Sequence, residues 1–153
     1  TTHIQRNLTS PLCSIKGANY LDNILAKQMV QQKGANEALF LNTQGSVAEG
    51  TMSNVFCMID DRLITPDVTS GLLPGVTRAL VLEIAHQVGI KVEERKLYPN
   101  ELLDASEIFL TSSLLELMPV TVFDGRSIHN GHPGVITQRL HSEYKKIIRT
   151  MCY

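Results

Sequence analysis

The stretch that decides the fold is Val47-Ala48-Glu49-Gly50-Thr51-Met52-Ser53-Asn54, which runs directly into the apolar segment Val55-Phe56-Cys57-Met58-Ile59. Val47 and residues 55–59 predict short strands on either side of a loop that carries Glu49. Working outward, Ala38-Leu39-Phe40-Leu41 and Arg62-Leu63-Ile64-Thr65 are typical of further short strands, and turn residues separate them. This part of the chain therefore predicts strands joined by tight turns.

Helical spacing appears on both sides of these strands. From Asn19, apolar residues recur at helical intervals until Lys33-Gly34, and we expect their face to pack on a sheet. Residues 77–88 predict a second helix that ends at Gly89, and residues 136–151 predict a third. The expected inward-facing residues are Leu21, Ile24, Leu25 and Met29 in the first helix, Leu80, Val81, Ile84, Ala85 and Val88 in the second, and Ile136, Leu140, Tyr144, Ile147, Ile148 and Met151 in the third.

The remaining segments complete an alternation of strands and helices. Residues 91–95 predict an exposed edge strand, 99–103 a short helix and 108–110 a buried strand. Residues 120–123 and 126–128 flank Asp124-Gly125, a pair that tolerates positive φ, and so predict a hairpin. The pattern favours an α/β fold with a mixed sheet curled around helices.

Length and charge narrow the classes of function. A chain of 153 residues with 43% hydrophobic and 19% charged residues is the size of one domain, so we expect residues 1–153 to form a single unit. Lys and Arg number 14 and Asp and Glu 15, which gives no positive excess to attract nucleic acid or an anionic membrane surface. We therefore expect neither as a partner.

The cysteines, the histidines and the apolar stretches indicate the cellular compartment, the absence of a metal site and the absence of a membrane helix. Cys13, Cys57 and Cys152 are odd in number and lack metal-ligand spacing, which suits a reducing compartment, so we expect a cytoplasmic protein. The five histidines show no paired spacing, and we expect no metal site. No apolar stretch approaches the roughly 20 residues of a membrane helix.

Four separated motifs carry the candidate chemistry. Lys16 stands in Ser14-Ile15-Lys16-Gly17-Ala18-Asn19-Tyr20, and Glu49 follows at a distance. Gly75-Val76-Thr77 opens a helix whose first amides have no internal partners, and Thr111-Ser112-Ser113 closes an apolar run. A lysine, a carboxylate and two sets of anion donors are the parts that hold pyridoxal phosphate. Each also has a plainer interpretation, as a solvated charge, a helix cap or a loop hydrogen bond.

Taken in this order, the motifs resemble the class IV aminotransferases, the fold-type IV pyridoxal phosphate enzymes, over about residues 14–140. The resemblance implies an α/β pseudobarrel, a small amino substrate and a homodimer. Members of this family carry a smaller domain before the lysine. We therefore expect this chain to be the larger, cofactor-binding domain of a longer protein.

The resemblance also assigns roles, residue by residue. It implies that Lys16 binds the cofactor covalently and moves a proton at the substrate carbon, and that Glu49 keeps the pyridine nitrogen protonated. It places the phosphate on Gly75, Val76 and Thr77, with Ser112 and Ser113 as further contacts. For Ser53 and Asn54 two roles remain, contact with the cofactor or ordering of their loop through hydrogen bonds to the backbone. Arg78 is expected to point outward in a salt bridge, away from the cofactor.

The same family contains several reactions. The spacing between Lys16 and the Asn19-Tyr20 pair is one residue shorter than in branched-chain enzymes. Residues 19–27, 71–78 and 101–107 resemble bacterial aminodeoxychorismate lyase, which releases pyruvate and 4-aminobenzoate for folate synthesis. A D-amino acid or branched-chain aminotransferase is the alternative. A relative without catalysis that binds a phosphorylated ligand is the third possibility.

Overall fold

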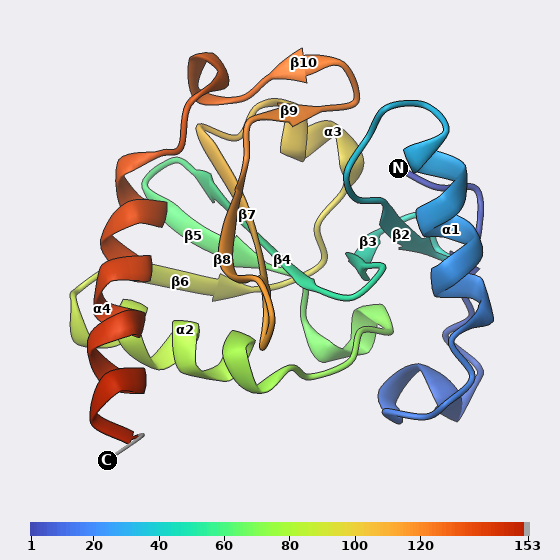
Figure 1. Cartoon of the computed structure of the whole chain (residues 1–153), viewed down its shortest axis with the longest axis horizontal. Helices are drawn as coiled ribbons and strands as arrows, with labels where there is room; N and C mark the ends of the chain where they lie inside the picture. Colours follow the sequence, from blue (N-terminus) through green and yellow to red (C-terminus); the bar gives the residue numbers. More distant parts are fainter. Residues whose placement is uncertain (152–153) are drawn as a thin grey trace.

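The computed structural model describes residues 1–151, so Cys152 lies outside the described part of the chain. Strands and helices alternate along it (Figure 1). The strands are β1 (Gln5–Arg6), β2 (Leu39–Asn42), β3 (Val47–Gly50), β4 (Asn54–Ile59), β5 (Arg62–Thr65), β6 (Lys91–Glu94), β7 (Glu107–Ser112), β8 (Glu116–Val120), β9 (Val122–Phe123) and β10 (Arg126–Ser127). The α-helices are α1 (Leu21–Gln31), α2 (Val76–Gln87), α3 (Pro99–Leu103) and α4 (Val135–Met151), and the 3₁₀ turns are η1 (Pro11–Ser14), η2 (Val68–Ser70) and η3 (His129–Gly131).

A five-stranded sheet in the order β6-β5-β4-β7-β8 forms the centre. Its edge strand β6 runs parallel to β5, and the other neighbours are antiparallel. The central strand β4 is buried on both faces, which explains its uninterrupted apolar run. Val55 and Cys57 face one core cluster, whereas Phe56 and Met58 face the other.

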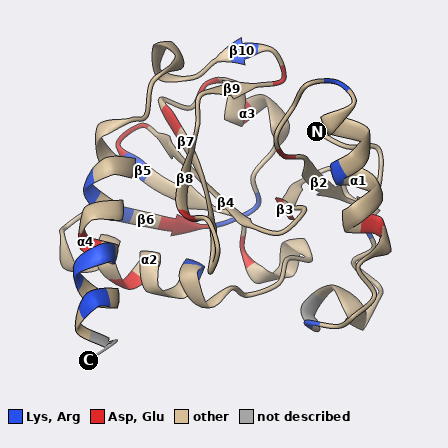
Figure 2. Ribbon diagram, viewed as in Figure 1, with Lys and Arg blue, Asp and Glu red and all other residues tan. Residues whose placement is uncertain are grey.

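Helices α2 and α4 cover the Phe56 side of this sheet (Figure 1). Their apolar residues Val81, Ile84 and Leu140 pack against Phe56 and Phe109, whose rings stack with centroids 5.0 Å apart. These helices bury the faces that their sequences predict, apart from Met151, whose side chain lies outside the described part of the structure. Basic and acidic residues are interspersed over the fold (Figure 2).

Helix α1 departs from the prediction. It packs beside the small sheet β1-β2-β3 through Ala26 and Val30, which meet Ala38 and Phe40. The expected inward face is exposed instead, with Leu21 67% and Ile24 50% accessible. The expectation was wrong because two apolar stripes share this short helix, and the one with the smaller side chains fits against β2.

The predicted α/β class, with mixed sheets and flanking helices, is confirmed. The described strands form three sheets, the third being the β9–β10 hairpin, and their curling into one pseudobarrel stays a prediction. Sequence patterns missed β1 and β8, and they merged the end of β8 with β9. The hairpin turn is as expected, since Asp124 and Gly125 both have positive φ.

Candidate active site

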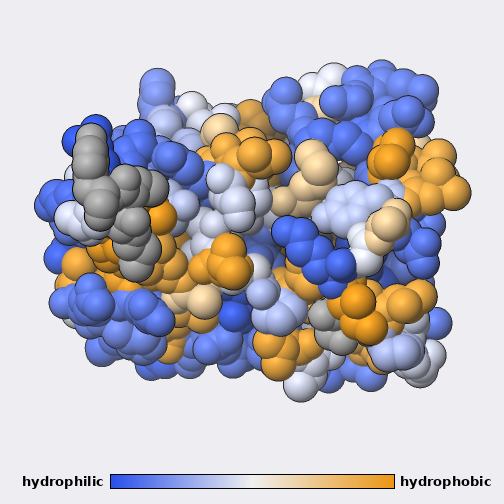
Figure 3. Space-filling view, turned by 60° about the horizontal axis from the view of Figure 1, so that its bottom comes forward, coloured by the Kyte–Doolittle hydropathy of each residue, from blue (hydrophilic) through white to orange (hydrophobic). Residues whose placement is uncertain are grey.

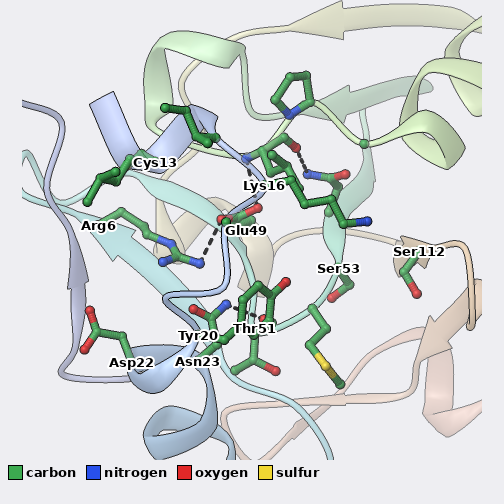
Figure 4. Close-up of a pocket in the computed structure, with 18 of the residues that line it drawn as sticks. Arg6, Cys13, Lys16, Tyr20, Asp22, Asn23, Glu49, Thr51, Ser53 and Ser112 are labelled. Carbon is green, nitrogen blue, oxygen red and sulfur yellow. Dashed lines mark hydrogen bonds and ion pairs between the residues drawn. The ribbon is translucent and has the colours of Figure 1, made fainter. Parts of the chain in front are cut away.

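A cavity of about 590 Å³ opens between the N-terminal segment, α1, the β3–β4 loop, the start of α2 and the end of β7. Figure 4 shows side chains converging on it from these elements. All nine residues predicted for the site line the cavity: Lys16, Glu49, Ser53, Asn54, Gly75, Val76, Thr77, Ser112 and Ser113. Positions from 16 to 113 in the sequence thus meet in one place.

Lys16 lies in the extended segment between η1 and α1 and is exposed at the cavity. In Figure 4 its side chain extends toward Ser53 and Ser112. Arg6 approaches Glu49 from the opposite side. A primary amine that projects into an open cavity is available to react with a carbonyl group.

Glu49 is buried at the bottom of the cavity on strand β3, where it pairs with Phe40, so the prediction that it lies in a loop was wrong. One carboxylate oxygen accepts a hydrogen bond from the Leu73 amide at 3.0 Å, and the other pairs with Arg6 at 3.0 Å. Both interactions favour the ionised form, yet burial outweighs them and raises the pKa of Glu49 to about 7. A cationic donor placed beside this carboxylate would stabilise its charge.

Asn54 orders the loop that precedes α2. Its side-chain amide donates to the Leu73 carbonyl at 2.8 Å, while Glu49 accepts from the Leu73 amide. Its oxygen would lie 2.3 Å from a Cβ on Gly75, so only glycine fits there. Asn54 thus orders the loop, and because it also lines the cavity, its contact with the cofactor stays a prediction.

Helix α2 begins with free backbone donors facing the cavity. Its N-cap is Gly75, which offers no side-chain cap, so the first amides are left for a ligand or water. The helix dipole adds partial positive charge at this end. Together with the buried Thr77, these amides form a site that suits a phosphate.

Two buried hydroxyls in the cavity have no protein partner. Ser53 is 6% and Thr111 1% exposed, and the oxygen of each lacks a hydrogen bond. Antiparallel pairing places Asn54 opposite Thr111, which brings Ser53 close to Ser112 and Ser113. Buried polar groups are normally satisfied, so these hydroxyls fit a cavity that receives a polar ligand. The amine, the buried carboxylate, the helix start and these hydroxyls together fit pyridoxal phosphate.

Arg78 corrects one prediction. It forms the expected salt bridge, with Glu94 at 2.6 Å, but it is buried and also donates to the Pro66 carbonyl at 2.9 Å. It does not point outward. The first turn of α2 packs against the loop after β5, and this encloses the guanidinium.

Sequence reasoning also missed residues of the cavity. Arg6, Tyr20 and Asn23 line it. Asn23 donates to the Thr51 carbonyl, which fixes α1 to the Glu49 loop. Asn23 shares the buried face of α1 with Ala26 and Val30, and a polar residue on this face of small side chains was a signal that could have revealed the contact. Arg6 gave no comparable signal because a two-residue strand carries it.

Within residues 1–151 no cluster of three or more His, Cys, Asp or Glu side chains is arranged to hold a metal ion. In the same part of the chain no helix has both the length and the apolar character needed to cross a bilayer.

The sequence profile of the family described as amino-transferase class IV matches residues 1–123. This chain belongs to the class IV aminotransferases. The family uses pyridoxal phosphate, which confirms the enzyme class and the cofactor that the resemblance implies. A putative branched-chain-amino-acid aminotransferase of Methanocaldococcus jannaschii is 39% identical over 134 residues, or 88% of this chain and 46% of that protein. A D-alanine aminotransferase of Bacillus licheniformis is 38% identical over 136 residues, or 89% of this chain and 48% of that protein.

Solved structures of class IV aminotransferases share the fold. The branched-chain enzyme of Thermobaculum terrenum in its pyridoxal phosphate form has a TM-score of 0.90 and 39% identity, covering 94% of this chain and 48% of that one. A putative 4-amino-4-deoxychorismate lyase of Legionella pneumophila has a TM-score of 0.89 and 34% identity, covering 95% and 53%. The chain thus spans about half the length of the relatives that it matches.

Proposed function

We propose that this chain is the cofactor-binding domain of a pyridoxal phosphate-dependent enzyme that acts on a small amino substrate. The observation that carries the proposal is the single cavity shared by Lys16, Glu49 and the start of α2. A domain that only bound a phosphorylated ligand would need the helix start, but neither the projecting amine nor the buried carboxylate.

Each end of the cofactor has a matching group. The amides at Gly75 and Val76 and the hydroxyl of Thr77 hold the phosphate, with Ser112 and Ser113 as further contacts. Ser53 supplies another hydroxyl to the same ligand. Glu49 would accept a hydrogen bond from the protonated pyridine nitrogen. When bound, pyridoxal phosphate supplies a carbonyl that links covalently to amines and a ring that accepts electrons from the adjacent carbon.

Lys16 has two tasks in this proposal. Its amine would hold the cofactor covalently when no substrate is bound. With substrate bound, the same amine would take the proton from the substrate carbon that bears nitrogen, which makes Lys16 the general base. Glu49 assists by stabilising positive charge on the ring nitrogen, toward which electrons move.

The reaction that follows distinguishes two candidates. As a 4-amino-4-deoxychorismate lyase, the enzyme would next expel pyruvate and leave the aromatic 4-aminobenzoate for folate synthesis. The resemblance of residues 19–27, 71–78 and 101–107 to the bacterial lyase supports this, as does the likeness to the Legionella pneumophila protein. The second candidate is transfer of the amino group from a D-amino acid or a branched-chain amino acid to a keto acid. The relatives named for those activities support it. Both reactions need the same proton removal by Lys16.

The assembly is also a proposal. The chain spans about half of its relatives, which supports a smaller domain elsewhere in the full-length protein. A homodimer would cover the exposed apolar side chains of α1, which Figure 3 shows in orange on the right of the molecule. A cytoplasmic location fits Cys13 and Cys57, which are free thiols.

The visible spectrum of the full-length protein tests this proposal. We expect a cofactor band that borohydride fixes to Lys16, whereas Lys16→Ala retains no covalently attached cofactor and loses about 10³-fold or more in rate. Lys33→Ala, at an exposed lysine in the turn after α1, is the control. A Lys16→Ala protein that still carries covalently bound cofactor would refute the role of the lysine.

Product analysis then separates the reactions. Release of 4-aminobenzoate from aminodeoxychorismate would establish the lyase, and keto acid formation from D-alanine with 2-oxoglutarate would establish an aminotransferase. If the full-length protein neither contains nor takes up pyridoxal phosphate, the proposed function is wrong.

A further inference from the structure

Arg6 occupies an unusual place for an arginine outside the predicted site. It lies on β1, which pairs in parallel with β2. Its guanidinium carbon is 4.2 Å from the ring centroid of Phe40, and one terminal nitrogen is 3.0 Å from Glu49. Phe40 and Glu49 are directly opposite each other in the β2–β3 pair. The guanidinium therefore spans a cross-strand pair that ends in the cavity.

The surroundings of Arg6 are not those of a fully satisfied structural arginine. Its side chain is 18% exposed, and its Nε is buried without a hydrogen-bond partner. A buried guanidinium loses hydration, and the Phe40 ring and the Glu49 carboxylate are the groups that compensate. The ring fixes the plane of the guanidinium and directs one nitrogen at the carboxylate.

The two carboxylate oxygens of Glu49 have different partners. Oε1 forms the ion pair with Arg6, and Oε2 accepts a hydrogen bond from the Leu73 amide, so each oxygen keeps lone-pair capacity for one more donor. Cys13, Lys16, Tyr20 and Asp22 are the other titratable groups along the same cavity. Among all these groups, Arg6 forms an ion pair with Glu49.

We propose that Arg6 is a positioning residue, which favours the ionised form of Glu49 and orients it so that its free lone pairs face the ring nitrogen of the cofactor. The inference rests on the proposed function. It makes the segment before Lys16 part of the active site, because one stretch of chain then carries both the amine that anchors the cofactor and the cation that prepares its carboxylate.

The titration of Glu49 in the cofactor-free, full-length protein tests this role directly. Carbon-13 labelling of glutamate would follow the carboxyl by NMR, and Glu49→Gln would identify its signal. We expect Arg6→Met and Arg6→Gln to raise the titration midpoint of Glu49 by at least about one pH unit, because the carboxylate loses its cationic partner. Arg6→Lys should keep this midpoint near the wild-type value. Arg6→Gln is the milder change and serves if Arg6→Met does not fold.

Cofactor affinity provides the second readout. At pH 7, Arg6→Gln should bind pyridoxal phosphate about fivefold more weakly than wild type, since raising the Glu49 midpoint from about 7 to about 8 lowers the ionised fraction from about one half to about one tenth. The difference should shrink above the shifted midpoint, and Arg6→Lys should recover most of the loss. A purely structural Arg6 would instead weaken binding equally at every pH.

The outcomes separate the two proposals. An unchanged Glu49 midpoint in Arg6→Gln overturns the role of Arg6, even if the cofactor binds normally. If the wild-type protein binds no pyridoxal phosphate, the proposed function fails, while the midpoint still reports whether Arg6 controls Glu49.

Discussion

At the scale of single residues, Glu49 is the group whose environment matters most. Its buried carboxylate touches Arg6 on one side and the Leu73 amide on the other. A side chain with these contacts contributes through its charge more than through its volume. Substitution by glutamine keeps the volume and removes the charge.

We therefore expect Glu49→Gln to retain cofactor but to slow proton removal by about 10²-fold or more, because the ring nitrogen loses its anionic partner. Single-turnover absorbance at saturating substrate measures this step. Glu83→Gln, at an exposed carboxylate of α2, is the control. An unchanged single-turnover rate in Glu49→Gln would refute the assigned role of the carboxylate.

The raised pKa of Glu49 also predicts how stability depends on pH. Burial raises the pKa to about 7 in the folded protein from an ordinary value of 4.5. The folded state thus favours the protonated carboxyl, and this contribution to stability is present below pH 4.5 and is lost as the pH rises through about 7.

In cofactor-free protein we expect the difference in unfolding free energy between wild type and Glu49→Gln to change by about 3 kcal/mol between pH 4 and 8, in the direction that weakens wild type. Denaturant titrations at several pH values measure it. Parallel pH profiles for the two proteins would show that the carboxyl is not perturbed.

At the scale of elements, the start of helix α4 is stabilised by a residue of strand β7. Glu107 at the start of β7 is buried and accepts the Ile136 amide at 2.9 Å, the Thr137 amide at 2.8 Å and the Thr137 hydroxyl at 2.7 Å. It therefore acts as the N-cap of α4 from a distance. A Cβ on Gly134 would overlap the Glu107 side chain, so the glycine makes room for this contact.

Glu107→Ala should lower the unfolding free energy by about 2 kcal/mol, because it leaves amides at the start of α4 without an acceptor and opens a gap beneath them. Thermal unfolding of the full-length protein measures the loss. Glu83→Ala, which removes an exposed carboxylate, should have little effect. Equal losses in the two variants would contradict the capping role.

Elements also show how far sequence reasoning reaches here. The helices α2 and α4 and the buried strand β4 follow from periodicity because each buries an apolar set against a large sheet. Strand β1 has two residues and too little pattern to be recognised, although it carries Arg6. Helix α1 was oriented wrongly because Ala26 and Val30 fit closely against β2, whereas the larger stripe stays exposed. The site residues were predictable from motifs, but the place of Arg6 depends on the pairing of β1 with β2.

At the scale of the whole molecule, the exposed stripe of α1 connects the fold to its assembly. Leu21, Ile24, Leu25 and Met29 lie on one face of the helix, and Leu12 and Ile15 are exposed on the segment just before it. Exposed apolar patches of this kind mark protein interfaces. They flank the cavity, because Leu12 and Ile15 also line it.

If this stripe lies in the proposed homodimer, Ile24→Asp combined with Leu25→Asp should shift the full-length protein toward monomer. The dissociation constant should rise by at least about 100-fold, since two carboxylates would be buried without partners. Light scattering over a range of concentrations measures this. Val68→Asp places the same charge on an exposed apolar residue of η2 and should leave the assembly unchanged. A double variant that keeps the wild-type mass at every concentration would place the interface elsewhere, because an interface cannot hold two unpaired charges at its centre without loss of affinity.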